Sequence, residues 1–197
     1  KNLESGKAAV KSIISIIKTP MEEEHGGLKA EKLVGRWEFV DVSFAYPSAP
    51  DKLVLKNVTF TIEPGQKIAF VGPSGCGKST IVQLMQRFYK PTSGTIMLDG
   101  VDLNAYDLTS LRGRLGYVQQ QPILFAKSIR YNVKLGSDGE NDVPDEVIWE
   151  ALHKAYARDF VENIDDKLDF YVGTQGGHLS GGQKQRIAIS RIVLAVT

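Results

Sequence analysis

The chain has little of several features that mark particular classes of protein. Its 197 residues include a single cysteine, Cys76, so no disulfide can form within them, and the composition fits a reducing compartment. The 24 Lys and Arg residues nearly balance the 23 Asp and Glu residues, which excludes the broad basic surface of a protein that wraps nucleic acid. No apolar run approaches the roughly 18 residues needed to cross a membrane. The length allows one domain of ordinary size.

Residues 1–33 have a different character from the rest. Residues 1–20 predict a basic amphipathic helix that ends at Pro20, either packed on its own domain or descending from a membrane helix as a connector. Residues 21–32 are charged and contain two adjacent glycines, which predicts a solvated linker. We therefore expect the globular domain to span residues 34–197. The apolar positions of the predicted helix are Val10, Ile13, Ile14 and Ile17.

Five segments of the domain have strand patterns. Residues 37–44 alternate, with Val40, Val42 and Phe44 on one face, and residues 57–62 and 95–98 are similar, so these strands are predicted to be half-buried and antiparallel. Residues 67–71 contain four consecutive apolar residues, which predicts a strand buried on both faces. Residues 115–119 predict one more short strand.

Helical patterns follow the strands. Residues 78–89 predict a helix, and a helical subdomain is expected over about residues 122–190. The whole pattern predicts an α/β fold in which this helical subdomain is inserted after the strand-rich part. One apolar stripe at helical spacing supports it, made of Val147, Ile148, Ala151, Leu152 and Ala155.

A phosphate-binding loop lies between the predicted strand at 67–71 and the helix at 78. The sequence Gly72-Pro73-Ser74-Gly75-Cys76-Gly77-Lys78-Ser79 fits the pattern G-x-x-x-x-G-K-[ST]. Its glycines let successive N–H groups face a triphosphate, and the helix start adds partial positive charge. Lys78 is expected to reach the β- and γ-phosphates and the Ser79 hydroxyl to bind Mg²⁺. The predicted nucleotide contacts here are Gly72, Ser74, Gly75, Cys76, Gly77, Lys78, Ser79 and Thr80.

Cys76 occupies a variable position of this loop, where a small residue is simply tolerated. A second interpretation is that its thiol reports on the site. Alkylation of Cys76 is then expected to block nucleotide binding, and bound MgATP to protect the thiol.

A second glycine-rich segment, Leu179-Ser180-Gly181-Gly182-Gln183, precedes another predicted helix and continues as Lys184-Gln185-Arg186. Here the chain resembles the ABC transporter family, whose signature is LSGGQ. The resemblance implies an ABC cassette with a P-loop core, an antiparallel β subdomain and the inserted helical subdomain. It also implies that Ser180, Gly181, Gly182 and Gln183 contact ATP held by a second cassette. We call residues 179–183 the signature segment and residues 72–79 the phosphate loop.

The same resemblance assigns two further residues. Tyr46 matches the aromatic residue that stacks on adenine, with a buried core tyrosine as the alternative. Gln120 matches the glutamine that contacts Mg²⁺ and the attacking water, although Gln119 and Gln121 adjoin it. The resemblance therefore implies Lys78 and Gln120 as catalytic residues, and Ser79 and Gln120 as Mg²⁺ ligands.

Residues 37–125 are most similar to exporters of the multidrug or peptide-transporter kind. This similarity implies MgATP-driven export through head-to-tail dimerisation with an identical or different cassette, on the cytoplasmic side of a membrane, beside a transmembrane domain and without nucleic acid. One departure is Thr174-Gln175, where exporters commonly carry Glu and Arg, so the charges for an electrostatic contact with a coupling helix are replaced there by uncharged side chains. Other functions considered are a cassette that binds ATP without hydrolysis and a soluble ABC ATPase of DNA repair or translation.

The family continues past residue 197 with the Walker B strand, which ends in Asp-Glu, and a switch histidine. We expect the printed residues to bind ATP but to be inactive alone, because the group that activates water is missing. The missing strand is also the expected sheet neighbour of residues 67–71, so the fragment is expected to fold poorly or the protein to be longer. The histidines at 25, 153 and 178 are interpreted as surface or loop residues.

Overall fold

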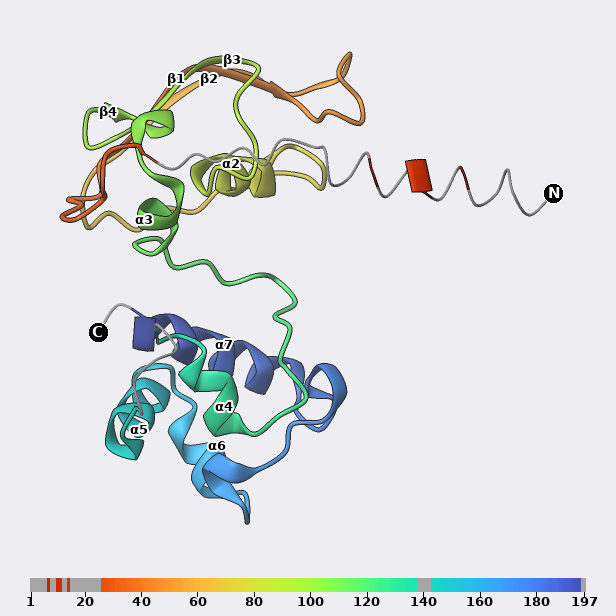
Figure 1. Ribbon diagram of the computed structural model, residues 1–197. Helices are drawn as coiled ribbons and strands as arrows, with labels where there is room; N and C mark the ends of the chain where they lie inside the picture. Colours follow the sequence, from red (N-terminus) through yellow and green to blue (C-terminus); the bar gives the residue numbers. More distant parts are fainter. Residues whose placement is uncertain (1–6, 8–9, 12–13, 15–25, 138–142, 196–197) are drawn as a thin grey trace. The chain divides into compact units, whose positions relative to one another are not determined.

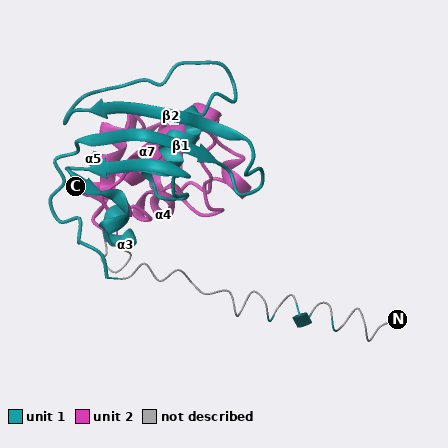
Figure 2. Cartoon of the chain, turned by 90° about the horizontal axis from the view of Figure 1, so that it is seen from above, with its two compact units in different colours: residues 1–111 teal, residues 112–197 magenta. Residues whose placement is uncertain are grey.

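The computed structural model describes residues 26–137 and 143–195, together with Lys7, Val10, Lys11 and Ile14 (Figure 1). The chain forms two compact units, residues 1–111 and 112–197 (Figure 2). Most of the predicted helix at 1–20, and residues 21–25 of the linker, lie outside the described residues. Within the described part, no helix is both long enough and apolar enough to span a bilayer.

The first unit is built on one antiparallel sheet. Its strands are β1 (Trp37–Ala45), β2 (Leu53–Ile62), β3 (Ser93–Leu98) and β4 (Val101–Asp102), in the order β2-β1-β3-β4. The three antiparallel strands predicted at 37–44, 57–62 and 95–98 are therefore confirmed.

The predicted face of β1 is wrong at Val40. The pairing with β2 and with β3 shifts register around Asp41, whose φ of 48° lies in the left-handed region. This irregularity interrupts the alternation, so Phe39 is buried before it and Val42 after it. Val40 is left 40% exposed instead of sharing the face of Val42 and Phe44.

Two predicted strands, 67–71 and 115–119, do not form. Both segments lack regular secondary structure, and Val71 is 93% exposed. A strand requires a neighbour that accepts and donates backbone hydrogen bonds. None of the described residues provides that neighbour for either segment.

Residues 27–30, which the sequence assigns to the linker, are docked on the first unit. The Leu28 N–H donates to the Ala105 carbonyl at 2.8 Å, and the Asp107 N–H donates to the Leu28 carbonyl at 2.9 Å. Ala30 is buried. A β-carbon added to Gly27 would stand 2.5 Å from the Asp107 nitrogen, so glycine is required for this approach.

Helix α2 (Lys78–Met85) lies beside the sheet, and η1 (Leu103–Ala105) and α3 (Leu108–Arg112) follow β4 (Figure 1). The helix predicted at 78–89 is therefore shorter than expected. Arg87 adopts a φ of 51°, a left-handed conformation that a continuing α-helix excludes.

The second unit is helical. It contains α4 (Ile129–Lys134), α5 (Asp145–Lys154), α6 (Arg158–Glu162), η2 (Lys167–Asp169), η3 (Thr174–Gly176) and α7 (Gly181–Ala195). Helices α4 and α5 both pack on α7. Ile148, Leu152 and Ile187 are wholly buried, and each such side chain contributes about 1.5–3 kcal/mol. The predicted stripe is confirmed on α5, and the fold is mixed α/β with an antiparallel sheet.

Candidate functional site

The phosphate loop ends at the start of α2, as the sequence predicts. The residue before the helix is Gly77, and no side chain caps the first N–H groups of α2. The first turn of α2 contains no acidic residue. The Lys78 ammonium donates to the carbonyls of Gly72 and Pro73 at 2.9 and 2.8 Å. These two hydrogen bonds fix the positive charge of Lys78 beside the loop. This arrangement favours an anion at the helix start.

Two glycines make the loop conformation possible. Gly75 and Gly77 have φ values of 81° and 95°, which favour glycine. Gly77 also packs against β2, because an added β-carbon would stand 2.6 Å from Leu55 Cδ2. An added β-carbon at Gly75 would meet no atom within 4 Å, so glycine is favoured there only by the backbone conformation.

The other polar residues of the loop lie in different surroundings. Ser74, Cys76 and Ser79 are exposed, and Cys76 Sγ lies 3.6 Å from Lys78 Nζ. Thr80 is buried, and its hydroxyl lies 2.9 Å from the Tyr46 hydroxyl. Ser79 is therefore accessible to a metal ion that arrives with phosphate groups, while Thr80 is occupied within the protein.

Tyr46 is half-buried beside α2. Its hydroxyl donates to Gln83 Oε1 at 2.8 Å, and a phenol carries one hydrogen, so it accepts from Thr80. Its ring meets Phe44 and Tyr89 edge-on at centroid distances of 5.0 and 5.2 Å. These contacts fix Tyr46 next to the helix that follows the phosphate loop. Stacking on adenine stays a prediction.

The signature segment forms a capping box at the start of α7. The Ser180 N–H donates to Gln183 Oε1 at 2.8 Å, and the Gln183 N–H donates to Ser180 Oγ at 3.3 Å. Leu179 is buried and anchors the segment, whereas Ser180 is exposed. The serine hydroxyl is thus held at the tip of the helix.

Gly181 and Gly182 have no structural requirement for glycine within the described chain. Both are exposed, and an added β-carbon would meet no atom within 4 Å at either position. Glycine in the first turn costs about 1 kcal/mol of helix stability relative to alanine. The two residues leave the end of α7 open to a close approach from outside.

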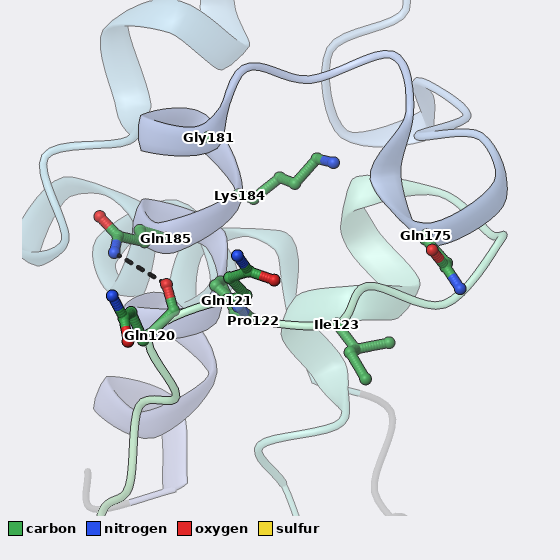
Figure 3. A pocket seen from close by; sticks show the side chains of 8 residues that line it. All are labelled: Gln120, Gln121, Pro122, Ile123, Gln175, Gly181, Lys184 and Gln185. Atoms are coloured by element: carbon green, nitrogen blue, oxygen red, sulfur yellow. Dashed lines mark hydrogen bonds between the residues drawn. The ribbon is translucent and has the colours of Figure 1, made fainter. Parts of the chain in front are cut away.

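Gln120 lies in the second unit, beside the first turns of α7 (Figure 3). Its carbonyl accepts a hydrogen bond from Gln185 Nε2 at 3.4 Å. Gln120 borders a cavity of about 520 Å³, in which Lys184 is the charged lining residue. The cavity is lined by Gln120, Gln121, Pro122, Ile123, Gln175, Gly181, Lys184 and Gln185.

Sequence reasoning did not identify Gln83 beside Tyr46, or Lys184 and Gln185 as part of this cavity. A signal was present for the last two, because the spacing of Gly181, Lys184 and Gln185 puts them on one helix face. Gln175, at the departure from the exporter pattern, lines the cavity with a left-handed φ of 52°.

No three His, Cys, Asp or Glu side chains gather into a metal-binding group in the part of the chain that the structure describes. His153 and His178 are exposed, as predicted, and His25 lies outside the described residues. Mg²⁺ commonly binds one or two protein ligands together with phosphate oxygens. The exposed Ser79 hydroxyl beside an anion-binding loop fits such an ion.

An uncapped phosphate loop and an open, glycine-rich helix start on a helical unit define a nucleotide-binding cassette. The family model described as "ABC transporter" matches residues 55–196, and the chain belongs to this family. It is 45% identical over 197 residues to ABC transporter B family member 15 of Arabidopsis thaliana, covering 98% of this chain and 16% of that protein. It is 44% identical over 190 residues to ABC multidrug transporter MDR2 of Trichophyton rubrum, covering 96% of this chain and 14% of that protein.

Comparison with solved structures leads to the same family, because the fold of this chain matches that of an ABC exporter. The chain superposes on a bacterial Atm1-family ABC exporter with ATP bound, with a TM-score of 0.83 and 35% identity, covering 98% of this chain and 33% of that one. The expected ABC cassette fold is therefore confirmed. The chain spans only about a sixth of the length of the curated relatives that it matches.

Proposed function

We propose that this chain is the nucleotide-binding part of an ABC exporter. It binds MgATP at the phosphate loop and presents its signature segment to ATP held by a second cassette. The ATP-bound exporter to which it is similar and the transporters among its relatives support this proposal.

The observation that carries the proposal is the state of the α2 start. Its N–H groups are uncapped, its first turn has no carboxylate, and an ammonium is fixed beside the loop. Backbone donors, the helix dipole and Lys78 therefore favour the same small, highly charged anion.

In the proposed site, Lys78 neutralises the β- and γ-phosphates and Ser79 binds Mg²⁺. Tyr46 stacks on adenine, and Gln120 contacts Mg²⁺ and positions the attacking water. Ser180, Gly181 and Gly182 of one cassette close on the γ-phosphate bound to the other. Loss of that phosphate then releases the pair.

The transmembrane domain is the second proposed partner. Ile123, Phe125 and Tyr131 are 63%, 55% and 43% exposed, and the rings of Phe125 and Tyr131 lie 6.4 Å apart. An exposed apolar group of this kind, in the segment after Gln120, fits a contact with membrane helices on the cytoplasmic side. We assign ATP hydrolysis to the intact protein.

The experiment is MgATP binding and hydrolysis by the intact transporter with Lys78→Ala. Binding is expected to fall about a hundredfold or more, because the charge beside the phosphates is lost. Lys67→Ala is the matched control, since Lys67 is an exposed lysine of the same unit outside the loop. Normal binding by Lys78→Ala would overturn the proposed site.

A further inference from the structure

Asn132 is a fully buried polar side chain whose amide is completely used. Its Oδ1 accepts from the Phe125 N–H at 2.9 Å. Its Nδ2 donates to the carbonyls of Phe125 and Ser128 at 2.9 and 3.0 Å. Asn132 is 0% exposed, so each of these bonds forms away from water. The side chain therefore holds the segment before α4 in one conformation.

Arg191 reaches the same group of atoms from α7. Its Nε donates to the Asn132 carbonyl and one terminal nitrogen donates to Asn132 Oδ1, both at 2.7 Å. Its other terminal nitrogen donates to the Ile123 carbonyl at 3.2 Å. The guanidinium thus binds three oxygen atoms of α4 and of the segment that follows Gln120.

The environment of Arg191 is unusual for a charge. Burial lowers the pKa of its guanidinium, and no carboxylate among the described residues forms an ion pair with it. Arg191 is half-buried, and burying part of a charge without an opposite charge is costly, so the hydrogen bonds to the three oxygen atoms offset part of that cost. An apolar side chain would fill the same space at lower cost but would leave those oxygen atoms without this donor.

The backbones of α4 and α7 also approach each other closely where the two helices pack. A β-carbon added to Gly136, just after α4, would overlap the Arg191 carbonyl. Side-chain and backbone contacts therefore meet at the same turn of α7, and residues 123–125 cannot shift along α7 without breaking them. Gln185 adds a bond from the same helix to the Gln120 carbonyl.

We propose that Arg191, acting with Asn132, is a positioning residue for ATP hydrolysis. It fixes the segment that follows Gln120 to α7, the helix that begins with the signature segment. Arg191 lies about 16 Å along α7 from Ser180, too far to touch a nucleotide there. Its effect therefore passes through Gln120, and the inference rests on the proposed function.

The test is a double-mutant cycle in the intact transporter, with Gln120→Ala and Arg191→Lys alone and together. Lysine keeps the charge but cannot span three acceptors with one planar fork. We expect Arg191→Lys to lower kcat about tenfold or more while the Kd for MgATP changes by less than about twofold. In the Gln120→Ala background, Arg191→Lys should lower kcat by less than about twofold further.

A purely structural role predicts a different result, because the two reductions in kcat would then multiply; that result would overturn the inference. The rate is expressed per bound nucleotide, so loss of folded protein does not count as loss of rate. If Arg191→Lys does not fold, Arg191→Met fills the same space without charge and enters the same cycle. Arg158→Lys is the control, since Arg158 pairs with Glu162 on the surface of α6. If the parent protein shows no MgATP turnover, the proposed function fails and not the positioning role alone.

Discussion

Ser180 and Gln183 cap one another: the Ser180 N–H donates to Gln183 Oε1 at 2.8 Å, and the Gln183 N–H donates to Ser180 Oγ at 3.3 Å. Gln183 therefore stabilises the helix end that presents the serine, whether or not it also touches nucleotide. The last residue of the signature segment has a physical role that its resemblance to LSGGQ does not convey.

Loss of this cap should loosen the first turn of α7. We predict that Gln183→Ala speeds exchange of the hydrogen-bonded amides of Ser180, Gln183 and Lys184 by about fivefold, since a lost cap costs about 1 kcal/mol. Gln183→Glu keeps an acceptor at the same place and should leave exchange unchanged. Hydrogen exchange of the intact protein without nucleotide measures both. Unchanged exchange in Gln183→Ala would contradict the capping role.

The phosphate loop should not tolerate a side chain at Gly77. We predict that Gly77→Ala lowers stability by about 1–2 kcal/mol more than Gly65→Ala and abolishes MgATP binding. Both glycines have positive φ, but only Gly77 faces Leu55 at a distance too short for a β-carbon. Thermal melting compares the stability of the two variants, and nucleotide titration compares their binding of MgATP. Equal melting temperatures would show that Leu55 moves aside without cost.

Tyr156 is 84% exposed and adopts a left-handed φ of 55°. A tyrosine is strained there, whereas asparagine tolerates this conformation. Tyr156→Asn should raise the melting temperature through a gain of about 1 kcal/mol, because the Arg186 hydrogen bond to residue 156 uses its backbone carbonyl. Tyr171→Asn, at an exposed tyrosine without positive φ, should give no gain. A lower melting temperature for Tyr156→Asn would contradict this account.

Acid should weaken the second unit through Asp169. Arg130 donates to both carboxylate oxygens, at 2.9 and 3.2 Å, and chiefly for this reason the pKa of Asp169 lies below its usual value. Such a carboxylate stabilises the fold above its unfolded-state pKa of about 4, and the contribution is lost as the pH falls through the folded-state pKa. Asp169→Asn should therefore flatten the loss of stability below about pH 4. Parallel acid unfolding curves for both proteins would show that the pair contributes nothing.

Much of the fold could be predicted where a local pattern has a local partner. Residues 57–62 alternate and pair with β1, and the stripe of α5 packs on α7. The pattern failed at Val40, because a bulge cannot be read from alternation. It failed at 67–71 because an apolar run becomes a strand only beside another strand. The predicted end of α2 was wrong because nothing in the sequence of residues 86–89 indicates that Arg87 adopts a left-handed conformation.

The candidate site divides in the same way. The phosphate loop and signature segment are contiguous motifs, so the sequence placed them at the starts of α2 and α7. The cap between Ser180 and Gln183, the bonds of Tyr46 to Thr80 and Gln83, and the group around Asn132 depend on side-chain directions. Arg191 is 59 positions from Asn132, and no periodicity joins residues so far apart in the chain.

The central claim is that one triphosphate is held by the phosphate loop of one cassette and the signature segment of the other. It is tested most directly in pairs of intact chains in which one cassette carries Lys78→Ala and the other carries Ser180→Arg, or the matching change in a non-identical partner. Both changes then fall in one composite site and leave the other intact. The account predicts that MgATP occludes in about half as many sites as in the parent protein, whereas pairs with either change on both chains occlude none. No occlusion in the mixed pair would contradict a site shared between two chains.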